Sequence, residues 1–444
     1  MRRIISLCLF ATATLFPLSG RADTQAAPAL NQDAILALKA QIDAMKGEYE
    51  QRIRNLESQL AALQQQMLRS LPEPGAPATP SGQQVAAAPS SPSALNPAIT
   101  VVGNFLGRAD SRKVFNADGI RIDNKMSLRE AELDMRAAID PYADGVFVAS
   151  IESESPGSYA ASVEEAYVTI KKLPFQDRPP LGLQWKVGRF RPAFGANNIL
   201  HTHDLPQSFR PLPVQEFLGE EGFIQSGISA SFYIPTPWDA QSSLDASVQV
   251  LTGGEIAIAA PGENRTSYLG HLRWYRAFGA AHSLQAGWSS YVQPSGSRRG
   301  TTGLHGVDLM YRWKPLRQGE WKSLVFSGEF MFARRPAVVE TSAAGGETAY
   351  GRPAGFTAFG QWQFNRRIYA GLRWDQTGVL DRPSWKRRSL TPYVSYYFSE
   401  FLRFRINYEQ RWSRMLEEDG RRSIFAELNL VFGSHPPEPF WVNK

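Results

Sequence analysis

Residues 402–411, Leu-Arg-Phe-Arg-Ile-Asn-Tyr-Glu-Gln-Arg, alternate apolar and polar side chains along most of their length. Successive side chains of a β-strand point to opposite faces, so a strand here has one apolar face and one face that carries arginine, asparagine and glutamate. Lipid would not tolerate that second face, whereas a water-filled lumen would. The segment therefore predicts a transmembrane β-strand.

The same two-residue period recurs between Ala98 and Phe432, in segments of about ten residues, which is the length of a tilted membrane-spanning strand. A soluble β-sandwich would be unusual with so many amphipathic strands in one unit. We therefore predict an all-β transmembrane barrel of about 16 antiparallel strands. The candidate strands begin near Ile99, Met126, Val146, Val163, Leu181, Phe223, Ser242, Ser267, His282, Thr302, Trp321, Gly355, Arg367, Arg388, Phe401 and Ser423.

The connections between these segments alternate between short and long. Residues 140–145 and 399–400 form short connections, whereas residues 191–222 and 334–353 form long ones. Outer-membrane barrels have short periplasmic turns and longer extracellular loops. The alternation predicts an even-stranded barrel with both ends in the periplasm, located in the outer membrane of a Gram-negative cell.

The first 22 residues have the features of a secretory signal peptide. Arg2 and Arg3 precede an apolar stretch, and small residues around Arg21 favour cleavage after Ala22. A membrane anchor is the alternative, but the apolar stretch of about fifteen residues falls short of the roughly 20 that a helical span needs. Cys8, the only cysteine, lies in this segment, so the mature chain is expected to have no disulfide.

Three further segments flank the predicted barrel. Residues 23–69 are expected in the periplasm, and residues 30–69 repeat apolar side chains in a heptad pattern. This pattern predicts an α-helical coiled coil that would self-associate, as a homotrimer if the barrel is trimeric; a helix on the periplasmic face of the barrel is the alternative. Residues 70–97 are rich in proline and alanine and predict an extended linker. Residues 433–444 contain too many prolines for a strand and are expected as a tail near the periplasmic rim.

Charge and motifs exclude other classes of protein. Removal of the signal peptide leaves 45 basic against 42 acidic side chains, and no basic run stands out. Nucleic acid is therefore not an expected partner, in contrast to membrane lipid and small ions or solutes. The sequence has no glycine-flanked nucleophilic serine, zinc-protease helix motif or phosphate loop, so we do not expect an enzyme.

The long segment 191–222 joins the fifth and sixth predicted strands, which makes it the third extracellular loop. A loop of this length is usually functional when it is ordered. In a sixteen-stranded barrel it can fold into the lumen and narrow it, and its charges then influence which ions pass. The charged candidates for this constriction are Arg191, Arg210, Glu216, Glu220 and Glu221.

Within this loop, His201, His203 and Asp204 bring two imidazoles and a carboxylate close together. Such groups can bind zinc or a related cation. In the alternative, these side chains only hydrogen-bond the folded loop to the barrel wall. The candidates for a further metal ligand are Glu220, Glu221 and His435.

A stripe of arginines is predicted on the lumen side of the strands. Guanidinium groups bind phosphate or carboxylate through paired hydrogen bonds, so a free stripe would favour anions. We prefer the alternative in which these arginines pair with acidic side chains of the wall, because the mature charge is nearly balanced. The arginines are Arg273, Arg312, Arg373, Arg403, Arg405 and Arg411, and the acidic candidates are Glu130, Glu132, Asp134, Asp245, Asp308 and Glu409.

Residues 186–195, Lys-Val-Gly-Arg-Phe-Arg-Pro-Ala-Phe-Gly, resemble the phosphate-selective and polyphosphate-selective porin family. The resemblance implies a signal peptide, an N-terminal coiled coil, a sixteen-stranded trimeric barrel and passive diffusion of solutes. In that family, arginine and lysine at the constriction set the preference for phosphate. The constriction loop predicted here offers Arg191 and Arg210 beside several acidic residues.

A second resemblance lies in residues 198–206, Asn-Ile-Leu-His-Thr-His-Asp-Leu-Pro, together with residues 219–222 and 433–437. These stretches are similar to a group of outer-membrane proteins of which some carry the label of zinc-regulated, TonB-dependent receptors. This resemblance implies a connection with metal. A gated receptor needs a folded plug inside a barrel of roughly 22 strands, whereas residues 23–97 offer a helix and a linker, so we predict a channel.

Two functions therefore compete. The first is a porin that allows passive diffusion of small ions or solutes through a barrel narrowed by its third loop. The alternative is a metal-binding or zinc-uptake barrel in which His201, His203 and Asp204 capture the ion at the cell surface. A third, structural role would have the coiled coil tether the barrel to periplasmic or cell-wall partners.

Overall fold

The computed structural model describes most of the chain from residue 97 onward. The described residues are 51, 97–115, 119–155, 157–259, 265–294, 301–336, 350–380, 385–414, 418–434, 439 and 441–442. The predicted signal peptide, coiled-coil helix and linker lie outside them, apart from residues 51 and 97. Within the described ranges, no helix is long and apolar enough to cross a membrane.

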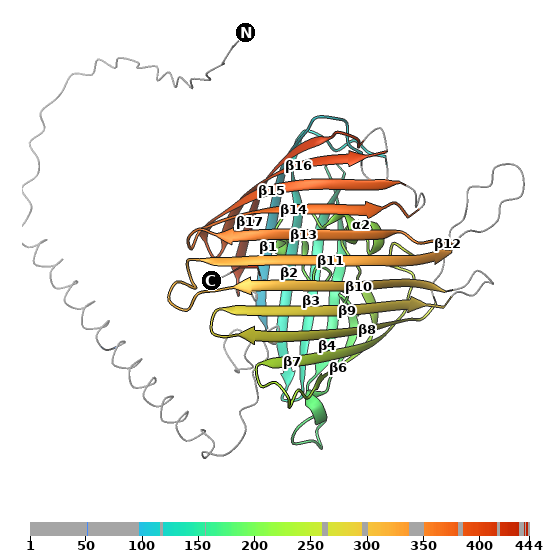
Figure 1. Ribbon diagram of the computed structural model, residues 1–444, viewed down its shortest axis with the longest axis vertical. Helices are drawn as coiled ribbons and strands as arrows, with labels where there is room; N and C mark the ends of the chain where they lie inside the picture. Colours follow the sequence, from blue (N-terminus) through green and yellow to red (C-terminus); the bar gives the residue numbers. More distant parts are fainter. Residues whose placement is uncertain are drawn as a thin grey trace, which may run out of the picture. The chain divides into compact units, whose positions relative to one another are not determined.

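In the described part of the chain, sixteen long antiparallel strands and the two-residue β12 (Tyr350–Gly351) form one closed sheet (Figure 1). The barrel closes where β1 (Ala98–Asp110) pairs with β17 (Arg422–Gly433) on one side and with β2 (Lys125–Asp140) on the other. This closure confirms the predicted sixteen-stranded barrel. The two-residue β12 is not counted as a strand of the wall, because it pairs only with the end of β11. The remaining strands are β3 (Ala143–Ser155), β4 (Ser158–Ile170), β5 (Gln184–Phe190), β6 (Gln225–Ile234), β7 (Ser242–Leu251), β8 (Ser267–Phe278), β9 (His282–Gln293), β10 (Thr302–Trp313), β11 (Ser323–Pro336), β13 (Ala354–Gln363), β14 (Ile368–Gly378), β15 (Lys386–Ser399) and β16 (Leu402–Ser413).

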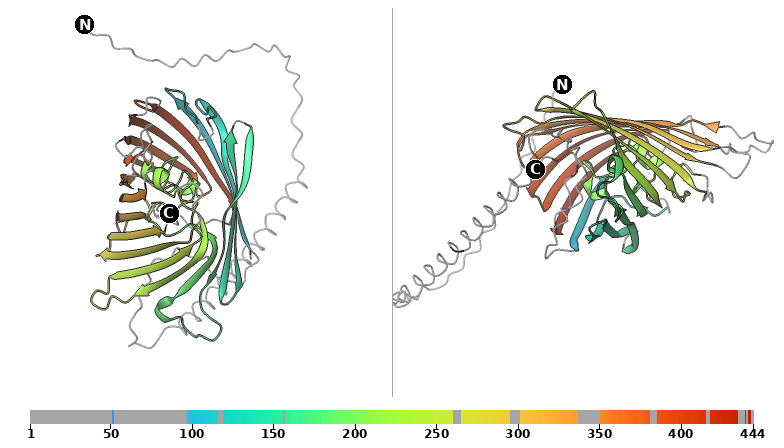
Figure 2. Two further views of the ribbon diagram at one scale, coloured as in Figure 1. Left: turned by 90° about the vertical axis from the view of Figure 1, so that its right-hand side faces the viewer. Right: turned by 90° about the horizontal axis from the view of Figure 1, so that it is seen from below.

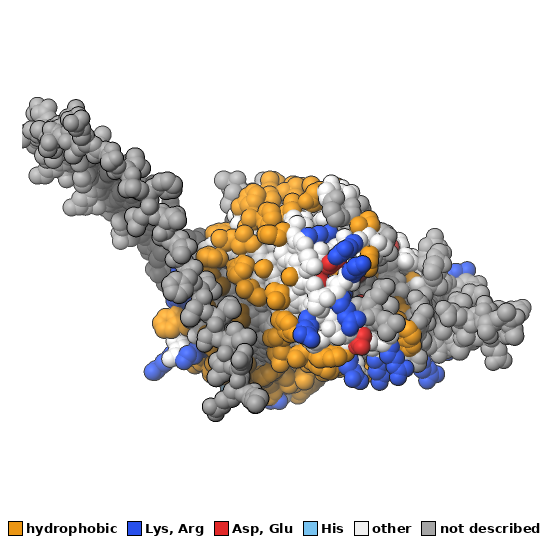
Figure 3. Space-filling view, turned by 90° about the horizontal axis from the view of Figure 1, so that it is seen from above, with side chains coloured by type: hydrophobic (Ala, Val, Ile, Leu, Met, Phe, Trp, Pro, Cys, Tyr) orange, Lys and Arg blue, Asp and Glu red, His pale blue; other side chains and the backbone are white. Residues whose placement is uncertain are grey.

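The walls show the predicted alternation of side chains. On β16, Ile406 is 47% exposed whereas the neighbouring Arg405 is completely buried, and on β10 Val307 is 51% exposed whereas Asp308 is 3% exposed. The apolar face points outward and the polar face lines the interior. Figure 3 shows one side of the barrel, on which hydrophobic side chains form broad areas with Lys and Arg side chains gathered beside them.

The predicted strand starts agree with the observed ones to within a few residues. The largest difference is at β4, which we expect to begin near Val163 and which begins at Ser158. In β4, Val163 pairs with Ala149 and Glu165 pairs with Val148, so Glu164 is an extra residue that forms a β-bulge. The bulge interrupts the alternation that locates a strand in a sequence, which explains the error.

The connections at the two ends of the barrel differ in length. Residues 141–142 and 400–401 are tight turns, whereas residues 191–224 form the long connection between β5 and β6. At the short-turn end, the connection between β4 and β5 is longer and contains the 3-10 turn η1 (Pro180–Gly182). The long loop between the fifth and sixth strands is therefore present as predicted.

Candidate functional site

The connection 191–224, called the inner loop below, lies inside the ring of strands, as the view along the barrel shows (Figure 2, left). It contains the 3-10 turn η2 (Thr202–Asp204) and the short helix α2 (Leu212–Phe217). Phe194 and Phe217 are fully buried and belong to a cluster with apolar side chains of β8 to β11. Apolar packing therefore fixes both halves of the inner loop to the inside of the barrel.

Two glycines allow the chain to enter the barrel. Gly188 has a φ of +134°, and a Cβ there would lie 2.2 Å from the Ala166 carbonyl oxygen. Gly195 has a φ of +60°, and a Cβ there would lie 1.6 Å from a carboxylate oxygen of Glu329 on β11. Only glycine adopts such angles without cost and leaves room for so close an approach. Both glycines belong to the segment 186–195 that leads into the inner loop.

The side chain of Asn198 ties the beginning of the inner loop to its end. Its Nδ2 donates hydrogen bonds to the carbonyls of Pro192 and Phe223, over 2.9 and 3.0 Å, and its Oδ1 accepts one from the Phe223 N–H over 2.7 Å. Asn198 is completely buried. Because these three bonds satisfy backbone groups that water cannot reach, Asn198 holds the two ends of the loop together.

Strands β14 and β16 hold the middle of the inner loop. Arg373 donates to the Phe209 carbonyl over 2.7 Å, and Arg403 donates to the His203 carbonyl over 2.5 Å. Arg405 donates to the carbonyl of Leu205. Charge-assisted bonds of this kind are stronger than bonds between neutral groups. The loop is therefore held at three successive places by guanidinium groups of the wall.

The six arginines predicted on the lumen side all lie on the inner face, and acidic groups or backbone carbonyls engage them. The acidic partners are Asp245 for Arg273, Asp375 for Arg373, Glu427 for Arg403 and Arg405, and Glu409 for Arg411; Arg312 donates to the carbonyl of Val442. Asp245 and Glu409 thus pair with arginines as the preferred alternative expects. Glu130 and Glu132 instead face the loop histidines, and Asp134 binds Arg136.

The charged residues predicted for the constriction are mostly engaged within the loop or with the wall. Arg191 pairs with Glu164, and Arg210 donates to the carbonyls of Asn197 and Leu200. The remaining three are Glu216, which binds Arg387 over 3.0 Å, Glu221, which accepts a hydrogen bond from Thr202, and Glu220, which is exposed. Of the five, Glu220 and Glu221 are the residues most accessible to water.

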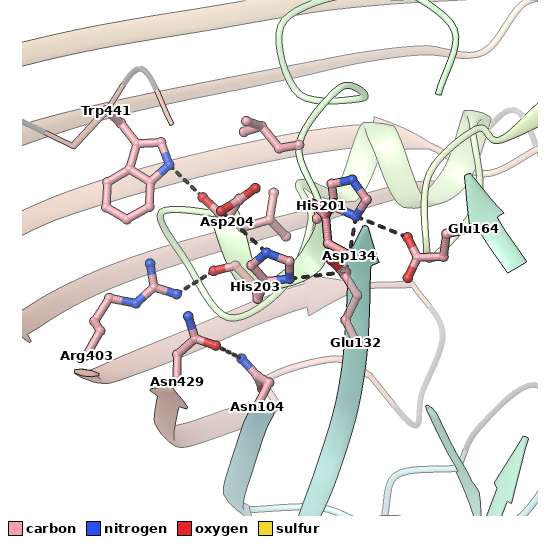
Figure 4. A network of polar contacts seen from close by, with 12 residues as sticks. Asn104, Glu132, Asp134, Glu164, His201, His203, Asp204, Arg403, Asn429 and Trp441 are labelled. Atoms are coloured by element: carbon pink, nitrogen blue, oxygen red, sulfur yellow. Dashed lines mark hydrogen bonds and ion pairs between the residues drawn. The ribbon is translucent and has the colours of Figure 1, made fainter. Parts of the chain in front are cut away.

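The two loop histidines meet a group of buried glutamates (Figure 4). His201 Nδ1 lies 3.2 Å from Glu132 Oε2 and 3.3 Å from Glu164 Oε2, and its Nε2 lies 3.3 Å from Glu165 Oε2. His203 Nδ1 lies 3.4 Å from the same Glu132 oxygen. Carboxylates of β2 therefore face both imidazoles, and those of β4 face His201.

Asp204 is placed differently from the prediction that it joins the histidines as a metal ligand. Its carboxylate lies 3.6 Å from His203 Nε2, on the side of that ring away from Glu132, and it belongs to neither group of side chains that could hold a metal ion. Glu220 and Glu221 also lie outside these groups, and His435 lies outside the described residues. The carboxylates that face the histidines come from the wall, which the spacing along the loop could not show.

The backbone of Asp204 contacts the chain end. Its carbonyl accepts a hydrogen bond over 2.7 Å from Trp441, whose indole is completely buried. Trp441 and Val442 pack inside the barrel with Tyr369 and Tyr397. Tyr369 is the second residue of β14 and Tyr397 is near the end of β15, so the described part of the tail lies inside the barrel at its short-turn end.

Charge around the histidines favours their protonated form. Burial lowers the pKa of both rings, but attraction to Glu132 and the neighbouring carboxylates outweighs it. The pKa of His201 lies well above its ordinary value, and the pKa of His203 is raised to about 9. Protonated imidazoles thus compensate part of the buried negative charge.

Sequence reasoning missed Glu164 and Glu165 because adjacent residues of a regular strand point to opposite faces. The bulge at Glu164 turns both side chains inward, and they are 5% and 7% exposed. Two successive acidic residues in an otherwise alternating strand are a usable signal, since one of them would otherwise face lipid. Asn198 and Trp441 carry no comparable signal.

Comparisons with known proteins agree with this architecture. No family model matches the chain. A protein of Aquifex aeolicus (strain VF5), described as uncharacterized, is 26% identical over 353 residues, which cover 71% of this chain and 70% of that protein.

Two solved structures illustrate the structural similarity. Salmonella typhi OmpF in complex with daunomycin superposes with a TM-score of 0.51 and 11% identity, covering 76% of this chain and 98% of that one. The anion-selective porin from Comamonas acidovorans gives a TM-score of 0.49 and 10% identity, covering 75% of this chain and 98% of that one. The similarity to OmpF, together with the closed sheet of sixteen strands, shows that the chain has the porin fold.

Proposed function

We propose that this chain forms a channel in the outer membrane through which small ions or solutes diffuse passively. The observation that carries the proposal is the wall of the barrel, which is apolar outside and polar inside. Ile406, for example, points outward and its neighbour Arg405 points inward. An apolar outer wall suits the hydrocarbon of a bilayer, and a polar lining suits water. The porin fold is a fold of channels and not of enzymes, so no catalytic role is proposed.

The inner loop is proposed to form the constriction of this channel. Guanidinium groups hold its backbone at Phe209, His203 and Leu205, so the loop is fixed across the interior. The arginines that hold it are already occupied by carbonyls and carboxylates. We therefore propose weak selectivity for ions in place of the phosphate site that the family resemblance implies.

Single-channel recording tests the proposed channel. The full chain, refolded without a tag and added to planar bilayers, is expected to give stable ohmic current steps. Reversal potentials in chloride and phosphate gradients should show only a modest preference for either sign of charge. Absence of current steps from protein with a correctly folded barrel would contradict the proposal, and a strong preference for phosphate would contradict the weak selectivity.

Cysteine labelling tests the position of the constriction. Asp204→Cys places a thiol on the inner loop, and Trp238→Cys places one in the connection between β6 and β7, where the side chain is 74% exposed. A negatively charged thiol reagent should reduce the conductance of the first variant and leave that of the second unchanged. Equal effects on both variants would show that the inner loop does not narrow the path.

Outer-membrane location and trimeric assembly remain predictions that solution experiments can check. Membrane fractionation should recover the chain with the outer membrane, and light scattering of the detergent-solubilised protein should give the mass of three chains. Deletion of residues 30–69 should weaken the trimer if the predicted coiled coil supplies it. A monomeric mass for the full chain would contradict the predicted assembly.

A further inference from the structure

Several atoms of the buried acidic group around the loop histidines lack a hydrogen bond of good geometry. Glu130, Glu132, His201 and His203 are each at most 7% exposed. Among the described residues, the Nδ1 atoms of both histidines and the Oε2 atoms of both glutamates have no hydrogen-bond partner of good geometry. Buried polar atoms without partners are costly, and a site that keeps several of them together fits a ligand that supplies the missing interactions.

The distances within this group match the coordination shell of a small metal ion. The Nδ1 of His201 lies 3.2 Å from Glu132 Oε2 and 3.3 Å from Glu164 Oε2, and these ligand atoms all lie within 4.8 Å of one another. Zinc binds imidazole nitrogen and carboxylate oxygen at about 2.0–2.2 Å, so two ligand atoms of a tetrahedral site are about 3.3 Å apart. The group is therefore arranged much as ligands are around an ion.

We propose that His201, Glu132 and Glu164 bind a divalent transition-metal ion, of the kind represented by Zn²⁺, which fastens the inner loop to strands β2 and β4. The combination of one imidazole and two carboxylates favours zinc and similar ions over calcium and magnesium, which prefer oxygen ligands alone. Since metal binding needs only the folded barrel, this inference does not depend on the proposed channel activity.

The surroundings of His201 support a metal ligand. Its second ring nitrogen, Nε2, lies 3.3 Å from Glu165 Oε2, so the carboxylate can hold that proton and leave Nδ1 free for the ion. This pairing of a ligand histidine with an outer carboxylate is common at zinc sites. Arg191 pairs with Glu164 and fixes its orientation.

The net charge of the group also calls for a cation. Glu130, Glu132, Glu164 and Glu165 are all buried, and Arg191 together with the imidazoles of His201 and His203 compensates only part of their negative charge. Burying several carboxylates without positive charge is strongly unfavourable. A divalent ion at Glu132 would supply that charge at the place where two histidines and the carboxylates converge.

Zinc titration of the tag-free full chain tests the proposal. The protein, refolded in detergent and treated with a chelator, should bind one Zn²⁺ per chain in calorimetry. Glu165→Gln, which alters the outer carboxylate, should weaken binding by about 10–100-fold. Glu132→Gln and His201→Gln, which remove ligands, should weaken it further.

Two control variants distinguish this site from adventitious binding. Asp204→Asn alters the acidic residue that the sequence suggests, and His271→Gln alters a partly buried histidine elsewhere in the barrel, which bonds to Ser289. Both should bind zinc as the unaltered chain does. No binding by the unaltered chain, equal binding by Glu132→Gln and His201→Gln, or loss of binding only in Asp204→Asn would overturn the proposal.

A spectroscopic measurement covers the case in which the ligand variants fail to fold. Folding is checked by the heat-dependent migration of barrel proteins on gels. Co²⁺ added to the unaltered chain should give the visible absorption of a four-coordinate ion, and X-ray absorption of the Zn²⁺ form should show one imidazole in the first shell. The spectrum of a hydrated six-coordinate ion would overturn the site without any variant.

Discussion

The indole N–H of Trp441 donates a hydrogen bond to the backbone carbonyl of Asp204 over 2.7 Å, although 237 positions separate the two residues in the sequence. Arg403 lies beside both, because its guanidinium is 5.4 Å from the centre of the indole ring and it also donates to the His203 carbonyl. The end of the chain and the inner loop therefore support each other inside the barrel.

Substitution of Trp441 should loosen this contact in two steps. Trp441→Phe removes the donated hydrogen bond and should destabilise the barrel by about 1 kcal/mol. Trp441→Ala also removes the buried ring and should cost roughly 3 kcal/mol or more. Urea unfolding in detergent micelles measures both values, and equal costs for the two variants would mean that the ring packing contributes nothing.

Asn198→Ala should free the ends of the inner loop. The substitution leaves the Phe223 N–H and the Pro192 carbonyl buried without their partner, at a cost of about 1–3 kcal/mol for each group. Open-channel current noise should rise, because the loop moves more. Asn198→Asp keeps the acceptor for the Phe223 N–H and should show a smaller rise in current noise than Asn198→Ala. A larger rise would contradict the proposal that Asn198 holds the two ends of the loop together.

Gly195→Ala should prevent the inner loop from seating on β11. The added Cβ would meet Glu329 at 1.6 Å, in addition to the strain of a positive φ. Gly119→Ala is a matched control, since Gly119 has a φ of +74° and open space around it. We expect a loss of roughly 1–2 kcal/mol for the control from the backbone alone and a clearly larger loss for Gly195→Ala; similar losses would show that the contact with Glu329 is unimportant.

Attachment of the inner loop should weaken at alkaline pH in the presence of a chelator. The pKa of His203 is raised to about 9 in the folded chain, above the value of about 6.5 in the unfolded chain. Its protonation therefore contributes stability that is fully present below pH 6.5 and is lost as the pH rises through 9. Hydrogen exchange of the loop amides, corrected for the intrinsic rate, should show more opening at pH 10 than at pH 7.

His203→Asn tests whether this residue causes the pH effect. The variant cannot gain or lose the proton, so the pH dependence of loop opening should be reduced. A pH dependence in the variant as steep as in the unaltered chain would assign the effect to another group.

The sequence was sufficient to predict the barrel because lipid outside and water inside impose a period of two on every strand. Alternating residues such as Arg405 and Ile406 therefore reveal both the strand and its orientation. The same rule located the inner loop, since its length stands out among short turns. It failed at Glu164, where a bulge interrupts the period of two.

The candidate site was predictable only in its loop half. His201 and His203 are two residues apart, so the spacing alone indicates a cluster of imidazoles. Glu132 and Glu164 come from two strands that are not adjacent to the loop in sequence, and only the register of the folded wall brings them to the histidines. Asp204 was expected beside them because it follows His203 in the sequence. Neighbours in a sequence, however, are not always neighbours around an ion.

Several bonds join the inner loop to residues that follow it by 164 to 237 positions, namely Phe209 to Arg373, Leu205 to Arg405 and Asp204 to Trp441. These partners are made last when the chain is synthesised, and contacts between distant positions form late and slowly. These anchors can therefore form only after the final hairpins have joined the wall. Closure of the barrel and complete attachment of the inner loop consequently depend on the same last strands, so a chain cut short before β16 would lack both the β1–β17 pairing and the bonds from Arg403, Arg405 and Trp441.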